Sequence, residues 1–119
     1  MSELSPTERT KVKRVPHKAA TDITALYDLL DQSLVAHVGI VEDGQPFVLP
    51  VVAARVGDRL LLHGSSASRL MKTIASGAPI CVTLTILDGL VLARSAFESS
   101  MNYRSAMILG SARALEGAE

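Results

Sequence analysis

The spacing of apolar residues changes once along the chain, from a helical repeat to a repeat of two. The segment from Thr21 to Leu34 places its isoleucine and leucines on one face of a helix, which predicts an amphipathic helix packed on a core. Thr21 or Asp22 is available to accept hydrogen bonds from the amides of its first turn. We therefore expect the fold to begin with one capped helix.

After this helix, alternating and β-branched apolar residues predict strands. Three runs, 34–41, 47–56 and Arg59–His63, are separated by turn sequences at Asp43-Gly44 and Gly57-Asp58, which are typical of tight hairpins. They predict an antiparallel meander. Pro50 falls inside the middle run, where its missing amide would cost a ladder hydrogen bond. We expect the strand to bulge there or to be an edge.

The second half of the chain predicts one short helix and two further strands. Residues 64–77 begin with serines, carry Leu70 and Ile74 on one face, and end at Gly77 before Pro79. Residues 80–85 alternate as a half-buried strand, Asp88-Gly89 predicts a turn or a bulge, and 103–115 predicts the last strand. Several short antiparallel strands with few helices indicate a mainly β (α+β) small barrel.

The composition of the chain predicts a single folded domain preceded by a basic arm. Of the 119 residues, 48% are hydrophobic and 20% charged, with 12 basic residues against 12 acidic ones. Residues 1–18 hold five basic and two acidic residues, so an arm of charge +3 precedes a body, 19–119, of charge −3. Zero net charge and 3% aromatics argue against nucleic acid as a partner.

Other classes of function have little support. Cys81 is alone, so no internal disulfide forms, and no long apolar segment indicates export or a membrane. We expect a cytoplasmic protein that does not enter membranes. His17, His37 and His63 lie 20 and 26 residues apart without a metal-binding motif, so no metal site is predicted. The sequence contains no GxSxG motif, so it does not indicate a hydrolase.

The most informative local sequence is HGSSASR, residues 63–69. A strand ends there, a glycine turns the chain, and hydroxyls and a guanidinium precede a helix, where unpaired amides favour an anion. Ser65, Ser66, Ser68 and Arg69 are therefore candidate phosphate ligands. The alternative is that one serine caps the helix and Arg69 is solvated. The run Leu49 to Ala53 offers an apolar wall with backbone polar groups, which suits a flat, partly polar ring.

A second polar cluster precedes the last strand. The segment Ser99 to Ser105, which includes Asn102, Tyr103 and Arg104, gathers donors and an aromatic ring. These residues are either ligand-binding residues or ordinary strand residues at the rim of the barrel.

Three segments together resemble the pyridoxamine 5'-phosphate oxidase-like, FMN-binding split-barrel family, in its nitroimidazole-resistance-type branch. They are HVGIVEDGQPFVLPVVAARVGDRLLLHGSSASRLMKTI, VTLTILDGLVLARSAF and SMNYRSAMILG. The resemblance covers about residues 18–117. It implies a six-stranded Greek-key split β-barrel that forms a homodimer, with FMN bound at the subunit interface.

The resemblance also implies roles for the candidate residues. The serines and Arg69 would bind the FMN phosphate, and Pro50, Val51 and Val52 would line the isoalloxazine. His63 would lie near the polar edge of the ring as a hydrogen-bond donor or proton carrier, or would face solvent. Asn102, Tyr103 and Arg104 would approach from the partner subunit or brace the site.

The chain departs from the family in two places. Glu98 and Ser99 stand where this branch has two histidines, and the chain ends before the helix and strand with which family members complete the barrel. We expect an FMN-dependent oxidoreductase acting on a small molecule, with a non-catalytic flavin-binding or sensing module as the alternative. Haem binding is a third reading, with His37 or His63 as the axial ligand.

Overall fold

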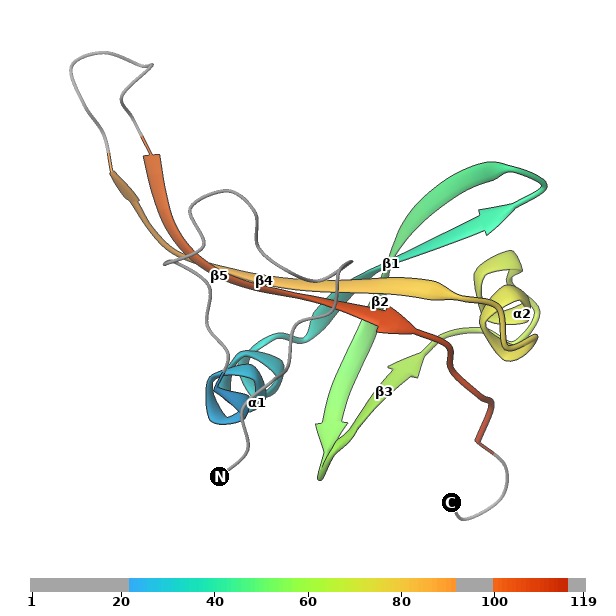
Figure 1. The fold of residues 1–119 in the computed structure, drawn as a ribbon, viewed down its shortest axis with the longest axis horizontal. Coiled ribbons are helices and arrows are strands. Elements are labelled where there is room, and N and C mark those ends of the chain that lie inside the picture. Colours follow the sequence, from blue (N-terminus) through green and yellow to red (C-terminus); the bar gives the residue numbers. More distant parts are fainter. Residues whose placement is uncertain (1–21, 92–99, 116–119) are drawn as a thin grey trace.

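The computed structural model describes residues 22–91 and 100–115. The basic arm 1–18, Glu98 and Ser99 lie outside them. Two helices and five strands follow one another along the chain (Figure 1). They are α1 (Ile23–Gln32), β1 (Val35–Glu42), β2 (Gln45–Val56), β3 (Arg59–His63), α2 (Arg69–Ala75), β4 (Ile80–Val91) and β5 (Ser100–Gly110).

The five strands form one antiparallel sheet in the order β3-β2-β1-β4-β5. The first three strands are the predicted meander. Strand β4 pairs with β1, the first strand of the meander, and this strand order defines a Greek key. In Figure 1, α1 lies against the sheet near β2 and β5, whereas α2 lies at the opposite end. The mainly β, antiparallel class predicted from the sequence is confirmed.

Both predicted hairpin turns are present. Asp43 and Gly44 have positive φ angles of 51° and 77°, and Gly57 has a φ of 62°. These left-handed conformations match the right-handed twist of the flanking strands, which is why two-residue hairpins select Asp-Gly and Gly-Asp. Pro50 pairs with His37 of β1 without a bulge. The pairing of β2 with β3 begins only at Val52, so Pro50 has a strand neighbour on one side alone, as an edge residue does.

Helix α1 is capped by Asp22, whose Oδ1 accepts from the Thr24 amide at 2.9 Å. The helix ends two residues earlier than predicted. The Leu34 carbonyl accepts a hydrogen bond from the Ala53 amide at 3.0 Å, and 71% of Leu34 is exposed. Leu34 was expected on the buried face of the helix, but its backbone is already bonded to β2.

The last two strands also differ from their predicted bounds. β4 continues to Val91 because Asp88-Gly89 forms a bulge in its pairing with β5 and not a turn. β5 ends at Gly110, five residues before the predicted end, although it starts earlier, at Ser100. The small polar segment before Tyr103 thus contributes its last residues to a strand.

The core lies on one face of the sheet, which we call the inner face. Its centre consists of alternate residues of β1, β2 and β4 packed against residues of the two helices. The fully or nearly buried members are Leu30, Ala36, Val38, Ile40, Val51, Ala53, Leu70, Ile74, Ile80, Val82 and Leu84. The opposite, outer face carries the intervening residues of the same strands, and no described helix covers it.

Ion pairs fasten α1 to the margin of the inner face. Arg55 of β2 donates to both carboxylate oxygens of Asp31 at 2.8 and 2.9 Å, and its guanidinium lies 4.3 Å from the centre of the Tyr27 ring. The hydrogen bonds from Arg55 lower the pKa of Asp31. The helix is therefore held by apolar contacts in the middle and by charge at its end.

Candidate functional site

Three of the predicted ring-binding residues come together on the outer face. Pro50 and Val52 lie two residues apart on β2, and His63 of β3 is the direct partner of Val52. Side chains of residues two apart, and of directly paired residues, point to the same face of a sheet. All three residues are exposed, Val52 to 57%. They form a continuous surface at the β2–β3 side of the sheet.

Val51 does not share that surface. Its side chain is 9% exposed and belongs to the core cluster of the inner face. A ring on the outer face can meet only the main chain of Val51. Its predicted role is therefore confined to backbone hydrogen bonding.

The serines after His63 are arranged largely for capping. The Ser68 hydroxyl donates to the Ser65 carbonyl at 2.8 Å and accepts from the Met71 amide at 3.1 Å, so it is the N-cap of α2. The Ser65 hydroxyl accepts from the Ala67 amide at 3.3 Å. Ser66 is exposed, and no described residue bonds its hydroxyl. Within this loop, Ser66 is thus the side chain with most freedom to bind a phosphate.

Gly64 gives this loop a tight approach to α2. A Cβ at this position would lie 3.0 Å from two atoms of the Met71 side chain. The turn from β3 into the helix therefore packs closely because residue 64 has no side chain.

Arg69 points away from the outer face. Its Nε lies 3.2 Å from Glu42 Oε2, and its guanidinium lies 4.7 Å from the centre of the Phe47 ring. Glu42 ends β1, Phe47 lies near the start of β2, and both alternate with outer-face residues of their strands. The pair is not a well-aligned hydrogen bond, since Glu42 Oε2 is enclosed yet has no hydrogen-bond donor. An anion that binds Arg69 must compete with this carboxylate.

The cluster before the last strand lies at the other side of the sheet. Strands β2, β1 and β4 separate Asn102, Tyr103 and Arg104 from β3, so one chain does not bring them to His63. Tyr103 is exposed on the outer face opposite Leu87, and Asn102 is exposed beside the bulge. Any contact of these residues with the surface at β2 and β3 would have to come from a second copy of the chain.

Arg104 is already bound on the inner side. Its guanidinium donates to both oxygens of Asp88 at 3.0 Å and to Gln32 Oε1 of α1 at 3.0 Å. The hydrogen bonds to the Asp88 carboxylate raise the pKa of Arg104. Arg104 thus joins β5 to α1 on the inner side, away from the surface at β2 and β3.

Sequence reasoning missed the apolar character of the whole outer face. Large hydrophobic side chains are exposed along four neighbouring strands, among them Val35, Val41, Val48, Val52, Leu87, Tyr103, Met107 and Leu109. Monomeric proteins rarely leave a contiguous apolar surface of this kind in water. The signal was present in run 34–41, which is apolar at nearly every position and not at alternate ones.

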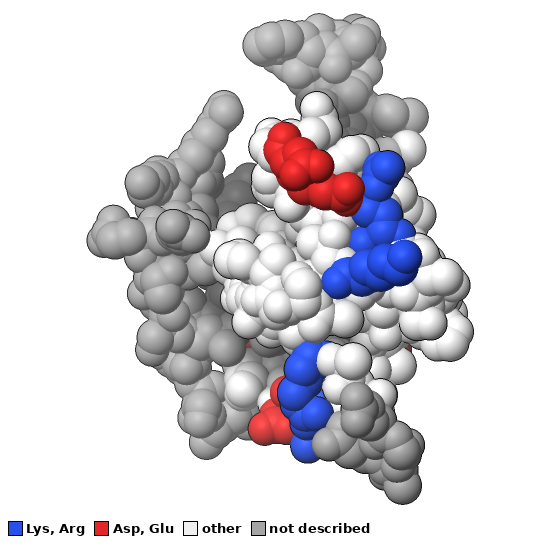
Figure 2. All heavy atoms as spheres, turned by 90° about the vertical axis from the view of Figure 1, so that its right-hand side faces the viewer, with Lys and Arg blue, Asp and Glu red and all other residues white. Residues whose placement is uncertain are grey.

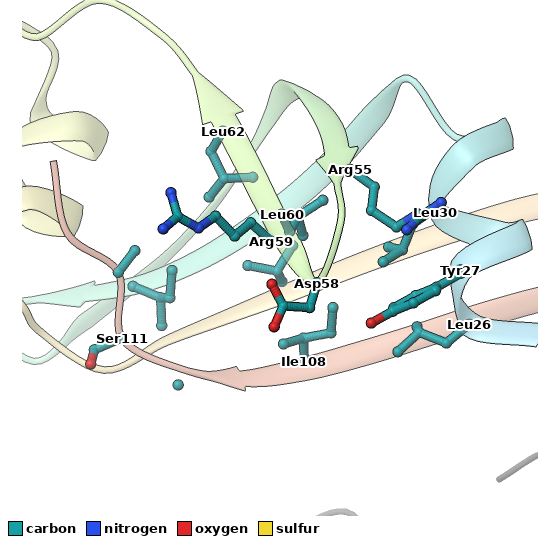
Figure 3. A pocket seen from close by; sticks show the side chains of 14 residues that line it. Leu26, Tyr27, Leu30, Arg55, Asp58, Arg59, Leu60, Leu62, Ile108 and Ser111 are labelled. Carbon is teal, nitrogen blue, oxygen red and sulfur yellow. The ribbon is translucent and has the colours of Figure 1, made fainter. Parts of the chain in front are cut away.

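Two cavities lie on the inner side and contain few of the predicted residues. One, of about 340 Å³, is lined by α1, β3 and the end of β5 and includes Tyr27, Arg59 and Ile108 (Figure 3). The second, of about 550 Å³, lies between β3, α2 and residues 111–115 and includes Ser66. Both are open hollows beside the edge strand β3.

Charged side chains and possible metal ligands are spread over the described surface. On the face shown in Figure 2, uncharged surface separates two places where Lys or Arg side chains gather, and acidic side chains lie near both. No group of three His, Cys, Asp or Glu residues is close enough to hold a metal ion within residues 22–91 and 100–115. Neither described helix is long and apolar enough to span a bilayer.

Comparison with known proteins decides the family. A family model described as pyridoxamine 5'-phosphate oxidase matches residues 22–119. The chain belongs to this family. No curated protein sequence matches the chain, whereas several solved structures do.

Two of these structures are 45% or more identical to the chain. The FAD and heme binding protein from Mycobacterium smegmatis is 48% identical, with a TM-score of 0.74, over 77% of this chain and 45% of its own length. The flavocytochrome Anf3 from Azotobacter vinelandii is 45% identical, with a TM-score of 0.82, over 92% of this chain and 51% of its own length. The chain thus spans about half the length of these relatives.

A third structure supports the predicted branch. A putative 5-nitroimidazole antibiotic resistance protein from Bacteroides thetaiotaomicron is 25% identical, with a TM-score of 0.59, over 76% of this chain and 54% of its own. The split-barrel class and the family resemblance predicted from the sequence are both confirmed.

Proposed function

We propose that this protein binds FMN on the outer face of its sheet and is an oxidoreductase of the pyridoxamine 5'-phosphate oxidase family. The observation that carries this proposal is the exposed surface of Pro50, Val52 and His63, which continues into the Ser65-Ser66 loop of a chain 45% identical to a flavocytochrome. An apolar platform beside hydroxyls and a turn matches the two ends of a flavin nucleotide.

The residues present fit this cofactor in kind. The ring would lie over Pro50 and Val52, with the main chain of Val51 available for hydrogen bonds. The exposed Ser66 hydroxyl, with that of Ser65, would bind the phosphate. When bound, FMN supplies hydride or electron transfer, while the protein supplies binding and orientation. His63 is placed to donate a hydrogen bond, or to hold a proton, at the edge of the ring.

We also propose that the active form is a homodimer. A second copy placed on the outer face would shield its exposed apolar side chains from water, and hydrophobic burial drives association of this kind. It would also bring Asn102 and Tyr103 of the partner subunit toward the β2–β3 surface, which their own chain cannot do. Arg104 would brace β5 from behind. We also assign the protein to the cytoplasm, because it has a single cysteine and its family model matches residues 22–119.

The first experiment is an absorption and fluorescence spectrum of the purified protein before and after heat release, with the solution mass measured by light scattering. A yellow dimer that releases FMN supports the proposal. Chromatography of the released cofactor separates FMN from FAD, and recovery of FAD alone would overturn the choice of FMN. A colourless protein that takes up neither flavin overturns the proposal as a whole.

Turnover separates the enzyme from a flavin-binding or sensing module. Oxidation of NADH or NADPH is followed with a nitro compound, a quinone or oxygen as acceptor. A rate above that of free FMN at equal concentration supports the oxidoreductase, and a rate equal to it supports the sensing module.

A second candidate function is haem binding, and it has an observation of its own. Both relatives at 45% or more identity are named for haem or for a flavocytochrome. His37 stands exposed on the outer face, between Pro50 of β2 and Thr83 of β4. Imidazole nitrogen is one of the axial ligands that haem iron takes in proteins.

A further inference from the structure

We propose that the second cavity, between β3, α2 and residues 111–115, binds an amphipathic monocarboxylate, that is, a carboxylate joined to an unbranched apolar chain. Arg59 binds the carboxylate at the mouth of the cavity, and the apolar chain lies on side chains of β3 and α2. The inference does not rest on the flavin proposal, because this cavity opens on the inner side of the sheet and the proposed flavin surface is on the outer face.

The floor of the second cavity is apolar. It includes Leu60 and Leu62 of β3 together with Met71 and Ile74 of α2. Ile74 is buried, whereas the other three are half-buried and pack against the core cluster. The cavity volume of about 550 Å³ lies within the range of roughly 300–1,000 Å³ that small-molecule sites have. An apolar chain in this place takes half-covered side chains out of water, which favours binding.

The charged side chains of the second cavity are all basic. Arg59 and Arg113 line it, with the Ser111 hydroxyl nearby, and its described lining contains no aspartate or glutamate. The first cavity differs, because Asp58 lies beside Arg59 there (Figure 3). Guanidinium groups at the mouth of an apolar cavity favour an anion with an apolar body over a cation or a neutral molecule. This charge difference assigns the carboxylate to the second cavity.

Arg59 carries the guanidinium that the chain leaves available. Arg55, Arg69 and Arg104 each bind a carboxylate of the chain itself. Among the described residues, the Arg59 guanidinium has no hydrogen bond, ion pair or ring contact. Arg59 is the first residue of the edge strand β3, and its long side chain borders both cavities (Figure 3). A carboxylate therefore gains a charge-assisted contact with Arg59 without displacing another partner.

The test is a calorimetric titration of the full chain with sodium decanoate below its micelle concentration. We expect one decanoate to bind per chain. Arg59→Ala should weaken binding by about fivefold or more, because a charge-assisted hydrogen bond is lost. Lys72→Gln is the matched control, since Lys72 is exposed on α2 and lines neither cavity. It should bind decanoate as the wild type does.

Analogues of decanoate test which part of the ligand is recognised. Decanol and decylamine keep the chain but lack the carboxylate, and each should bind at least about fivefold more weakly. Octanoate has two methylenes fewer and should bind up to about fifteenfold more weakly, since a buried methylene contributes up to about fourfold. Ala112→Trp, at a residue that lines both cavities, should also weaken decanoate binding by filling the space.

Four outcomes would overturn the inference. Wild-type affinity in Arg59→Ala would remove the carboxylate contact, and equal affinities for decanoate, decanol and decylamine would leave only a nonspecific apolar surface. Loss of binding in Leu87→Ala would place the ligand on the outer face. Competition between FMN and decanoate would make the cavity part of the flavin site, because Ser66 borders it.

The result also separates this inference from the flavin proposal. Protein that binds FMN but not decanoate would overturn the carboxylate site and leave the flavin surface intact, and the reverse result would do the opposite. Circular dichroism of each variant establishes that it is folded. Arg59→Ala changes an exposed side chain, so we expect it to fold as the wild type does.

Discussion

The two faces of the sheet have similar side chains and opposite surroundings. On β4, Leu84 is fully buried on the inner face, whereas Leu87 is 55% exposed on the outer face. On β1, Val38 is buried and Val41 is exposed. The inner face is covered by two helices, and Arg55 and Arg104 bind the end of one of them, α1, at the margin of this face. No described helix covers the outer face. The folding of a single chain therefore does not explain why the residues of this face are apolar.

The largest expected effect comes from truncating one leucine on each face of β4. Leu84→Ala should lower the free energy of unfolding by about 2–5 kcal/mol, because it leaves a cavity in the core. Leu87→Ala should change it by less than about 0.5 kcal/mol in the monomer. Urea denaturation at low protein concentration measures both. Equal losses in the two variants would mean that the outer face contributes to folding as much as the inner one.

A charge on the outer face should break association without unfolding the chain. Met107→Lys should weaken dimerisation by about 1.4 kcal/mol or more, which is tenfold in the dissociation constant, because a lysine would be buried in an apolar interface. Light scattering over a dilution series gives the constant. Ala25→Lys, on the exposed side of α1, is the matched control and should leave the mass unchanged. A dimer unaffected by Met107→Lys would place the subunit interface elsewhere.

Substitutions of Arg69 and Glu42 test whether Arg69, which lies on the inner side, also binds the phosphate of a flavin on the outer face. Arg69→Ala should weaken FMN binding by about 1.5–3 kcal/mol if its guanidinium binds the phosphate. Glu42→Gln should have the opposite sign and tighten binding, because it removes the carboxylate that competes for Arg69. Flavin fluorescence quenching measures both constants. If neither variant changes the affinity, Arg69 serves only the inner face, and the phosphate is bound by the serine loop alone.

The smallest effect concerns acid stability at the margin of the inner face. The pKa of Asp31 is lowered by its hydrogen bonds from Arg55. A carboxylate whose pKa is lower in the folded state stabilises the fold above its unfolded pKa and loses this contribution as pH falls through the folded value. Asp31→Asn should therefore flatten the decrease in melting temperature below about pH 4. Asp58→Asn, at an exposed carboxylate without an ion-pair partner among the described residues, should not flatten it.

Local chemistry made much of the fold predictable. Turns at Asp43-Gly44 and Gly57-Asp58 are set by residues that tolerate positive φ angles, and Asp22 and Ser68 cap the helices as short polar side chains do. Bounds were less predictable where the sheet competes with local preference. The apolar periodicity of the first helix runs on to Leu34, but a hydrogen bond from Ala53, 19 residues further along the chain, takes that residue into the sheet.

The candidate site was predictable in its parts and not in its arrangement. The ring wall and the phosphate loop were found from adjacent residues. Strand register turns the side chain of Val51 toward the core. Contacts between segments distant in the sequence bind Arg69 to Glu42 and Arg104 to Gln32. The exposure of the apolar outer face was also not predictable, because a strand that is apolar at every position does not show which of its side chains are covered.

The join between β1 and β4 gives the molecule a line of weakness. Only three residue pairs, His37↔Thr83, Val38↔Val82 and Gly39↔Cys81, link the β1-β2-β3 meander to the β4–β5 hairpin. By contrast, eight pairs link β1 to β2, and eleven link β4 to β5. We therefore expect amide protons at the join to exchange with solvent faster than those inside either ladder. His37 is one of the three β1 residues that make this join.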